Sequence, residues 1–111
     1  MTFNRFWSIA WLTCNLTWFA GIAEADTNYE LAERLAEVIV SKDACGYVLE
    51  EATIQAAIEK QVNANDWEFP NYMETNIYLE KQTLESLDEL QLKLRCQQLT
   101  RAGKKRGYIK P

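Results

Sequence analysis

Apolar residues recur at helical spacing from the start of the first regular segment. Four of them fall at positions i, i+4, i+7 and i+8 and so share one side of a helix: Leu31, Leu35, Val38 and Ile39. The four residues from Thr27 to Glu30 match a capping box, in which the Thr hydroxyl and the Glu carboxylate accept hydrogen bonds from otherwise unpaired backbone N–H groups. The pattern predicts a helix that begins after Thr27 and ends between Ser41 and Gly46.

A second helix is predicted over residues 50–62, where the apolar positions step by four residues: Ile54, Ile58 and Val62. Alanines at positions 52, 56 and 57 favour helix and permit close helix contact. The following segment NANDWEFPN, residues 63–71, is predicted to be a loop, because Asn and Asp favour turns and Pro70 marks the boundary of an element.

The helical pattern resumes at Asn71 and continues to about Ala102. A single helix of that length would extend about 48 Å at 1.5 Å per residue. Such a helix fits poorly in a compact chain of this size, whose radius of gyration is about 12 Å. The apolar stripe also shifts, from Met73, Ile77 and Leu84 to Leu87, Leu90 and Leu94. Because Ser86 to Glu89 is a second capping-box match, we expect a break between Thr83 and Ser86. The alternative is one long helix, stabilised by a dimer partner.

Residues 1–25 match a cleaved secretory signal peptide. Arg5 precedes a mostly apolar run of about eighteen residues, and Ala23-Glu24-Ala25 places small residues where a signal peptidase reads them. The alternative is a membrane anchor, since the run is near the lower limit for a transmembrane helix. Polar residues dilute the run and no Lys or Arg cluster follows it. We therefore expect a mature chain that begins at Asp26, with a cut two residues earlier as the alternative.

Whether the chain is exported determines whether its cysteines are expected to form a disulfide or to remain free thiols. Cys14 lies in the predicted signal peptide, where the residues before it do not form a lipoprotein signal, so Cys45 and Cys96 remain. Two cysteines in an oxidising compartment favour a disulfide over free thiols. Closing a loop of about fifty residues would stabilise the fold by roughly 4 kcal/mol in the loop-entropy model. We expect an all-α fold, a small three- to four-helix bundle stapled by one disulfide, with Gly103 as the last helix C-cap.

Charge divides the mature chain into two parts. Residues 26–92 hold fifteen Asp or Glu and four Lys or Arg, a net charge of −11, whereas residues 93–111 hold seven Lys or Arg and no acid. This asymmetry predicts a helical domain over 26–102 and a basic C-terminal tail over 103–111. Three tail cations could contact anionic lipid, glycan or an acidic partner: Lys104, Lys105 and Arg106. The simpler interpretation is that they complement the dipole of their own helix and the acidic helices.

An aromatic cluster lies in the predicted loop. Trp67, Phe69 and Tyr72 fall within six residues and are flanked by acids. Exposed, they would form a recognition patch of the kind enriched at interfaces. The preferred interpretation is that they plug the open end of a small bundle.

The chain contains no histidine, which removes the commonest general base and most zinc sites. No phosphate-binding loop or EF-hand spacing occurs. Adjacent acids, Glu50-Glu51 and Asp88-Glu89, resemble glycosidase pairs only superficially, because acids at helix starts are explained by the helix dipole. We therefore expect no catalytic residues, no metal and no cofactor, and a non-enzymatic protein.

Three functions remain as hypotheses: an exported accessory or inhibitory protein that binds a protein partner, an acid-responsive periplasmic chaperone, and a binder of anionic lipid or glycan surfaces. Nucleic acid is disfavoured by export, and a homodimer stays open. The segment ACGYVLEEATIQAAI (residues 44–58), the signal peptide and the late Cys96 resemble an uncharacterised family of small exported, one-disulfide helical proteins of bacterial envelopes. The resemblance implies a helical fold and a periplasmic or secreted location, and it assigns no activity.

Overall fold

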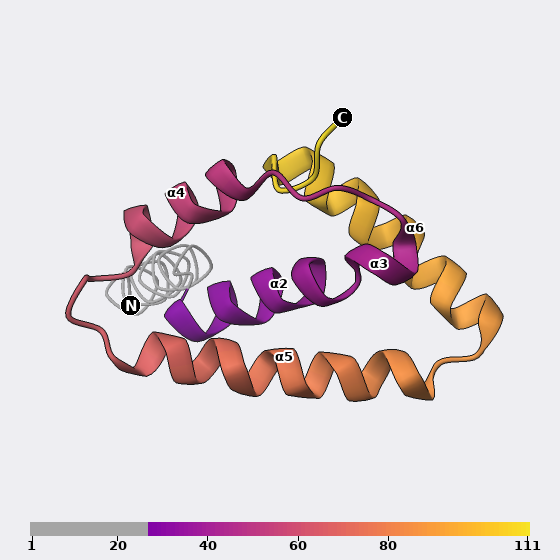
Figure 1. Ribbon diagram of the computed structural model, residues 1–111, viewed down its shortest axis with the longest axis horizontal. Coiled ribbons are helices and arrows are strands. Elements are labelled where there is room, and N and C mark those ends of the chain that lie inside the picture. The colour runs from indigo at the N-terminus through magenta and orange to yellow at the C-terminus, as the bar shows by residue number, and fades with distance from the viewer. Residues whose placement is uncertain (1–26) are drawn as a thin grey trace, which may run out of the picture.

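The computed structural model describes residues 27–111, and this part of the chain is helical (Figure 1). Its elements are α2 (Asn28–Val40), α3 (Lys42–Cys45), α4 (Glu51–Gln61), α5 (Glu68–Ser86) and α6 (Glu89–Arg106). The predicted all-α class is therefore confirmed, with four longer helices and the one-turn α3. The predicted signal peptide over residues 1–25, with Cys14, and the expected mature start at Asp26 lie outside the described residues.

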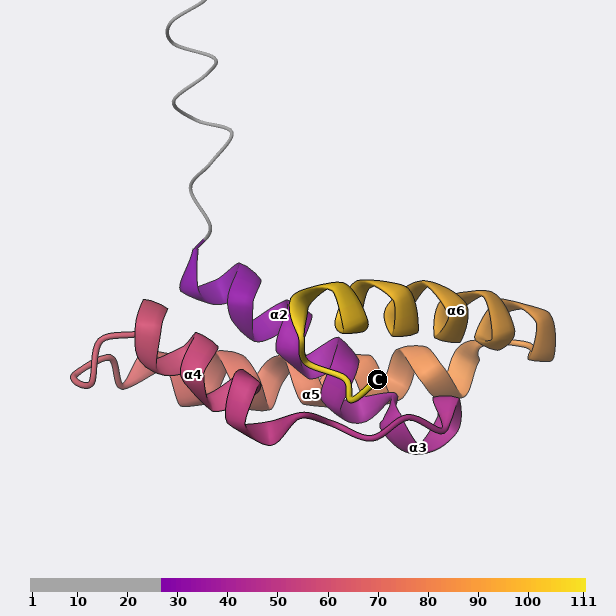
Figure 2. The same cartoon turned by 90° about the horizontal axis from the view of Figure 1, so that it is seen from above.

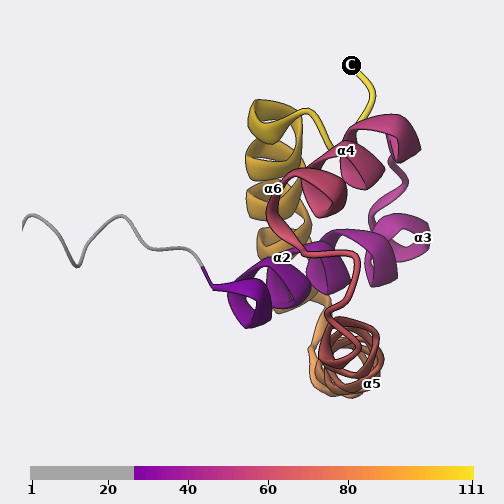
Figure 3. The same cartoon turned by 90° about the vertical axis from the view of Figure 1, so that its left-hand side faces the viewer.

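Helix α2 is the centre of the arrangement. In Figure 3, α5 is seen end-on on one side of α2, and α4 and α6 lie on the other side. α2 packs most extensively on α5 and also contacts α3, α4 and α6. Its predicted stripe is confirmed: Leu31, Leu35 and Val38 are buried, and Ile39 packs against the same core. The Thr27 hydroxyl oxygen accepts from the Glu30 N–H at 3.1 Å, as the capping pattern predicted.

Helix α4 matches its prediction within one residue at each end, and Ile54 faces the core. Helix α5 begins at Glu68, earlier than the predicted Asn71. Pro70 does not delay the helix, because a proline in the first turn lacks an N–H group that would have no intrahelical partner there. The predicted loop is therefore shorter than expected, and Phe69 belongs to the helix.

The break in the second half of the chain exists, but it lies slightly later than predicted. α5 runs to Ser86, Leu87 is extended, and Asp88 caps α6. Asp88 Oδ1 accepts from the Gln91 N–H at 2.8 Å, and Gln91 Oε1 accepts from the Asp88 N–H at 3.0 Å. The capping box therefore starts at Asp88 and not at Ser86. The Ser86 hydroxyl instead donates to the Thr83 carbonyl at 2.7 Å, within the last turn of α5.

The expectation that Gly103 caps the last helix is wrong. α6 continues to Arg106, and Gly107 caps it in the left-handed conformation, with φ of 80°. Gly103 is buried because the chain folds back over it: a Cβ atom there would lie 2.7 Å from Ile109 Cγ1. Glycine is needed at this position for close approach, and no bend of the helix depends on it.

The segment 103–111 is not a detached tail. Its first four residues are the end of α6, and Tyr108 and Ile109 are buried in the core. Ile109 pairs antiparallel with Leu49, in the connection between α3 and α4. The Glu50 N–H donates to the Tyr108 carbonyl at 2.7 Å, and the Lys110 N–H donates to the Val48 carbonyl at 2.9 Å. The end of the described chain is therefore built into the fold.

Candidate interaction site

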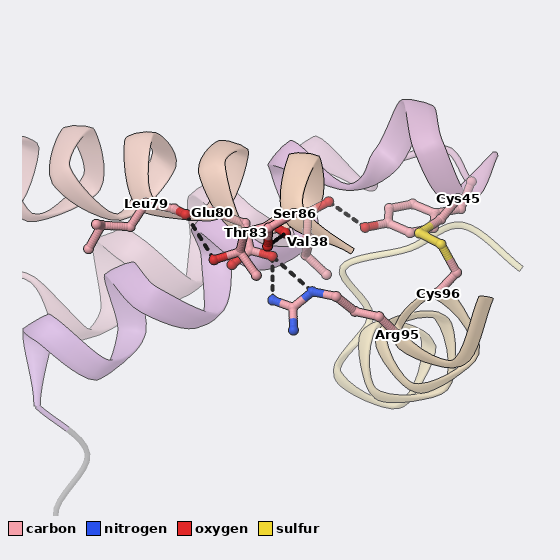
Figure 4. Close-up of polar contacts among 9 residues, drawn as sticks. Val38, Cys45, Leu79, Glu80, Thr83, Ser86, Arg95 and Cys96 are labelled. Carbon is pink, nitrogen blue, oxygen red and sulfur yellow. Dashed lines mark hydrogen bonds and ion pairs between the residues drawn. A yellow bond between two sulfur atoms is a disulfide. The ribbon is translucent and has the colours of Figure 1, made fainter. Parts of the chain in front are cut away.

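The predicted disulfide is present. Cys45, the last residue of α3, is bonded to Cys96 in the middle of α6, with the two Cα atoms 5.2 Å apart (Figure 4). The bond spans 51 positions in the sequence. It fixes one face of α6 against α3, which determines the side chains that α6 turns toward the core and those it turns away.

A polar junction links α5 to α6 beside this disulfide. Glu80 is 8 % exposed, and its Oε1 accepts from Arg95 Nε at 3.0 Å (Figure 4). Arg95 Nη2 donates to the same oxygen and completes an ion pair. Arg95 directly precedes Cys96, so the ion pair and the disulfide hold the same turn of α6 to two different elements. Nothing in the sequence pattern predicted this pairing, because the two residues belong to different helices.

Two further groups titrate abnormally around this junction. Tyr47 donates its hydroxyl to the Val38 carbonyl at 2.5 Å, and burial together with the charge of Glu80 raises the pKa of Tyr47 to about 12. Burial also raises the pKa of the Glu37 carboxyl above its ordinary value, and Glu80 and Glu33 raise it further, against the opposing charges of Arg95 and Arg106. The junction therefore keeps Tyr47 as a proton donor at all physiological pH values.

The predicted aromatic cluster divides into three environments. Phe69 is 6 % exposed and belongs to the core, so the plug interpretation holds for this residue. Tyr72 is half-buried, contacts Tyr29 edge to face at 5.4 Å between ring centroids, and donates to Glu68 at 2.7 Å. That hydrogen bond raises the pKa of the Tyr72 phenol. Trp67 is 81 % exposed, so the plug interpretation does not hold for this residue.

The loop that carries Trp67 is held by hydrogen bonds on both sides. Asp66 Oδ2 accepts from the Asn28 side-chain amide at 2.8 Å, which ties the loop to the start of α2. Asp66 Oδ1 accepts from the Glu68 N–H at 3.1 Å, and the Asp66 N–H donates to the Asn63 carbonyl at 2.9 Å. The exposed indole is therefore presented on an ordered loop at one end of the molecule, between α4 and α5 (Figure 1).

The three predicted cations do not form one patch. Lys104, Lys105 and Arg106 are exposed in the last turn of α6. Successive residues on a helix are rotated by about 100°, so their side chains spread around the axis. Arg106 borders the hollow lined by Glu37 and Arg95, whereas Lys105 lines a different hollow, to which Leu94 and Arg101 also contribute. This spread is what complementing the dipole of their own helix would produce.

The outer surface of α6 is the part of the candidate site that the sequence analysis missed. Leu90 is 65 % exposed and Leu94 is 56 % exposed, although both fell on a predicted apolar stripe. In Figure 2, α6 lies along one edge of the molecule, and no other described helix lies beyond it. The signal for this orientation was Cys96: a residue two positions away lies about 200° around the helix, so Leu94 faces outward once Cys96 faces α3.

Within residues 27–111, no helix has the length and apolar character that crossing a bilayer requires, and no cluster of three or more His, Cys, Asp or Glu side chains is arranged to hold a metal ion. Comparisons with protein-family models, with curated proteins and with solved structures found no match to the chain.

Proposed function

We propose that this chain is a small exported, non-enzymatic binding protein that contacts a protein partner through the loop carrying Trp67. The observation that carries the proposal is the contrast between neighbours in that loop: Phe69 is buried, whereas Trp67 is 81 % exposed. Tryptophan is among the residues that dominate binding energy at protein interfaces. An exposed indole costs solubility unless a partner covers it.

The order of the loop supports the same proposal. Asp66 ties it to α2 and to the first turn of α5 by hydrogen bonds. A side chain presented on a preorganised loop loses less conformational entropy on binding than one on a disordered segment. The disulfide supports an oxidising environment, and thus export, because such bonds persist in those compartments.

Charge around the loop limits the chemistry of the partner. Asp66 and Glu68 flank Trp67, and residues 26–92 carry a net charge of −11. A complementary partner offers an apolar pocket for the indole with Lys or Arg at its rim. Association with such a partner slows as salt is added, because the attraction between the two surfaces is screened.

The test uses the fluorescence of Trp67 itself. The other tryptophans, Trp7, Trp11 and Trp18, lie in the predicted signal peptide, so a chain that begins at Asp26 has Trp67 alone. A partner captured at neutral pH from the source compartment should shift the Trp67 emission to shorter wavelength in a 1:1 titration. The substitution Trp67→Ala should weaken that partner by at least about tenfold, as expected for an interface hot spot.

The matched control is Tyr78→Ala, since Tyr78 is an aromatic residue of α5 that is 60 % exposed at a distance from the loop in sequence. This variant should bind as the wild type does. Equal losses in both variants, or a partner whose binding leaves the Trp67 emission unchanged, would refute the proposed site.

The acid-responsive chaperone and the anionic-surface binder remain weaker proposals. Protonating the fifteen carboxylates of residues 26–92 would leave a strongly cationic chain, which favours loosening in acid. Glu37 acts in the opposite direction, because a carboxyl with a raised pKa makes the folded state gain stability as it becomes protonated. The spread of Lys104, Lys105 and Arg106 around α6 does not favour a flat anionic surface. Binding of a hydrophobic dye below about pH 3 tests the chaperone alternative. Vesicle binding by a variant with all three cations neutralised tests the anionic-surface alternative.

A further inference from the structure

A hollow lies between α2 and α6, on the side of α6 that faces the fold. Its volume is about 360 Å³, near the lower end of the range for pockets that hold small molecules. Its apolar part is formed by side chains that belong to the interior of the protein: Val38 of α2, Leu99 of α6 and Tyr108. The hollow can therefore take a small ligand and place an apolar group of that ligand against these side chains.

Three arginines line the same hollow: Arg34 of α2, and Arg95 and Arg106 of α6. Four lining positions of α6 follow one another at intervals of four, three and four, and so share one side of the helix: Arg95, Leu99, Ala102 and Arg106. α2 and α6 run in opposite directions (Figure 1 and Figure 2). Because Arg34 is the earliest α2 residue of the lining, it lies on the Arg106 side of the hollow.

The charges around the hollow do not cancel. Arg95 is matched by Glu80, whose Oε1 accepts from Arg95 Nε and Nη2. Of the other charged side chains of the lining, Arg34 and Arg106 are positive and Glu37 is negative. The lining therefore carries one positive charge in excess, which a ligand with a single negative charge would balance.

Glu37 does not neutralise the arginines as a close ion pair would. A carboxylate paired with a guanidinium has a lowered pKa, whereas burial and the charge of Glu80 raise the pKa of Glu37 against the opposing charges of Arg95 and Arg106. Glu33, which raises the same pKa further, is exposed to solvent. A guanidinium has five N–H donors, so an arginine of the lining can hold a further carboxylate beside the contacts that it already makes.

We infer that the hollow between α2 and α6 binds a small monocarboxylate with an apolar body. Arg106 and Arg34 hold the carboxylate, because the planar guanidinium matches the two oxygens of that group. The apolar body lies against Val38 and Leu99, away from water. This inference goes beyond the proposed function, since it concerns a small molecule and a surface other than the loop that carries Trp67.

Two simpler ligands fit the hollow less well. Inorganic phosphate carries more negative charge than the single excess positive charge of the lining, and it covers no apolar surface. A neutral apolar molecule would take the arginines out of water without giving them an acceptor, which is costly. An apolar acid satisfies both the cations and the apolar part of the hollow.

The first test uses hexanoate as the probe and the disulfide-bonded protein at pH 7 and low salt. Amide NMR signals should shift in a saturable way, most strongly at the residues of α2 and α6 that line the hollow, with a Kd of about 1 mM. Hexan-1-ol keeps the apolar body without the charge, and phosphate keeps charge without the apolar body. Each should bind at least about tenfold more weakly. The absence of a saturable shift with hexanoate, or equal binding of hexan-1-ol or phosphate, would overturn the inference.

A pair of matched substitutions locates the carboxylate. Arg106→Gln should weaken hexanoate binding by about tenfold, the effect of losing one charged hydrogen-bond partner. The control is Lys105→Gln, which removes the same charge from a neighbouring exposed position that lines a different hollow. This variant should keep the affinity within about twofold, because an exposed charge outside the hollow is screened by solvent. Equal losses in the two variants would place the carboxylate elsewhere and refute the site.

A third substitution should act in the opposite direction. Glu37→Gln removes the negative charge of the lining and should strengthen hexanoate binding by about threefold, because the repulsion between the two carboxylates is lost. A general loss of structure weakens binding in every variant, so it does not imitate this pattern of one loss and one gain. Weaker binding by Glu37→Gln, or unchanged binding, would contradict the inference.

Discussion

Helices α5 and α6 have nearly the same length, 19 and 18 residues, yet they are attached to the molecule in different ways. α5 lies along α2 and buries side chains near its start and its middle: Phe69, Asn76 and Glu80. α6 buries Leu99 and Gly103 and is otherwise held by discrete links, which are the disulfide, the Glu80–Arg95 ion pair and the pairing of Ile109 with Leu49.

This difference explains why the two most exposed leucines of the described chain, Leu90 and Leu94, lie on α6, although α5 also exposes Leu79. A helix attached by a continuous apolar stripe must turn most of its large apolar side chains toward its neighbour. A helix attached by a covalent bond and an ion pair can keep leucines on its free face, because its position does not depend on burying them. The free face of α6 is thus available for another molecule, whereas α5 is committed to the fold.

Removing the disulfide should have the largest effect and should act on α6 selectively. Replacing both Cys45 and Cys96 by Ala should lower the free energy of unfolding by about 4 kcal/mol, the value for a loop of this length. Chemical denaturation measures the loss. Hydrogen exchange should show α6 amides opening before those of α2 and α5, and equal loss of protection in α5 and α6 would contradict the distinction drawn between them.

Truncating Phe69, the buried aromatic residue at the start of α5, should lower the free energy of unfolding almost as much. Phe69→Ala removes a buried ring from the core and should destabilise the protein by about 3 kcal/mol. The same truncation on the free face of α6, Leu90→Ala, should change stability by less than about 0.5 kcal/mol. Thermal unfolding of the two variants at low protein concentration compares them, and a large loss for Leu90→Ala would mean that this leucine is buried within the monomer.

The ion pair between the two helices should contribute less than either of these. Glu80→Gln keeps the shape of the side chain and removes its charge, which leaves Arg95 without a counter-ion. Because Arg95 is 29 % exposed, water compensates in part, and we expect a loss of about 1–2 kcal/mol. The matched control is Glu85→Gln, which neutralises an exposed carboxylate on the same helix and should leave the free energy of unfolding unchanged. Urea denaturation at neutral pH distinguishes the two.

The smallest expected effect is a pH-dependent gain in folding stability when the charge of Glu37 is removed. Its pKa is raised in the folded state, so its charge costs stability above that pKa, and the cost disappears as the pH falls to the ordinary carboxyl value. Glu37→Gln should therefore stabilise the protein at pH 7 by less than about 1 kcal/mol, since solvent screens a half-buried group. The gain should vanish below the ordinary pKa of glutamate. A stabilisation that stays constant with pH would show that the charge of Glu37 is not its source.

The fold was largely predictable, because local signals determine most of it. The stripe from Leu31 to Ile39 and the cap at Thr27 are properties of neighbouring residues, and both are confirmed. The errors occur where two local signals compete. Ser86 and Asp88 could each begin a capping box, and the Ser86 hydroxyl is instead used by the last turn of α5. Gly103 matched a helix C-cap, but it is required for contact with Ile109, six residues later.

The candidate site was less predictable, because it depends on which side of each helix faces the core. Sequence periodicity placed Leu90 and Leu94 on one stripe of the helix and left open whether that stripe is buried, but it wrongly added Leu87, which is extended and precedes α6. The Glu80–Arg95 pair and the pairing of Leu49 with Ile109 join segments that are distant in sequence, and no local pattern reports on them. The burial of Tyr108 and Ile109 could have been predicted, because they are two apolar residues in an otherwise basic segment. The sequence analysis instead interpreted that segment by its charge, as a tail.

The burial of Tyr108 and Ile109 has a consequence for how the polypeptide acquires its structure during synthesis. These residues leave the ribosome after every element they pack against, and Cys96 follows Cys45 by 51 positions. The disulfide can therefore form once Cys96 has emerged, but the core is completed only when Tyr108 and Ile109 follow.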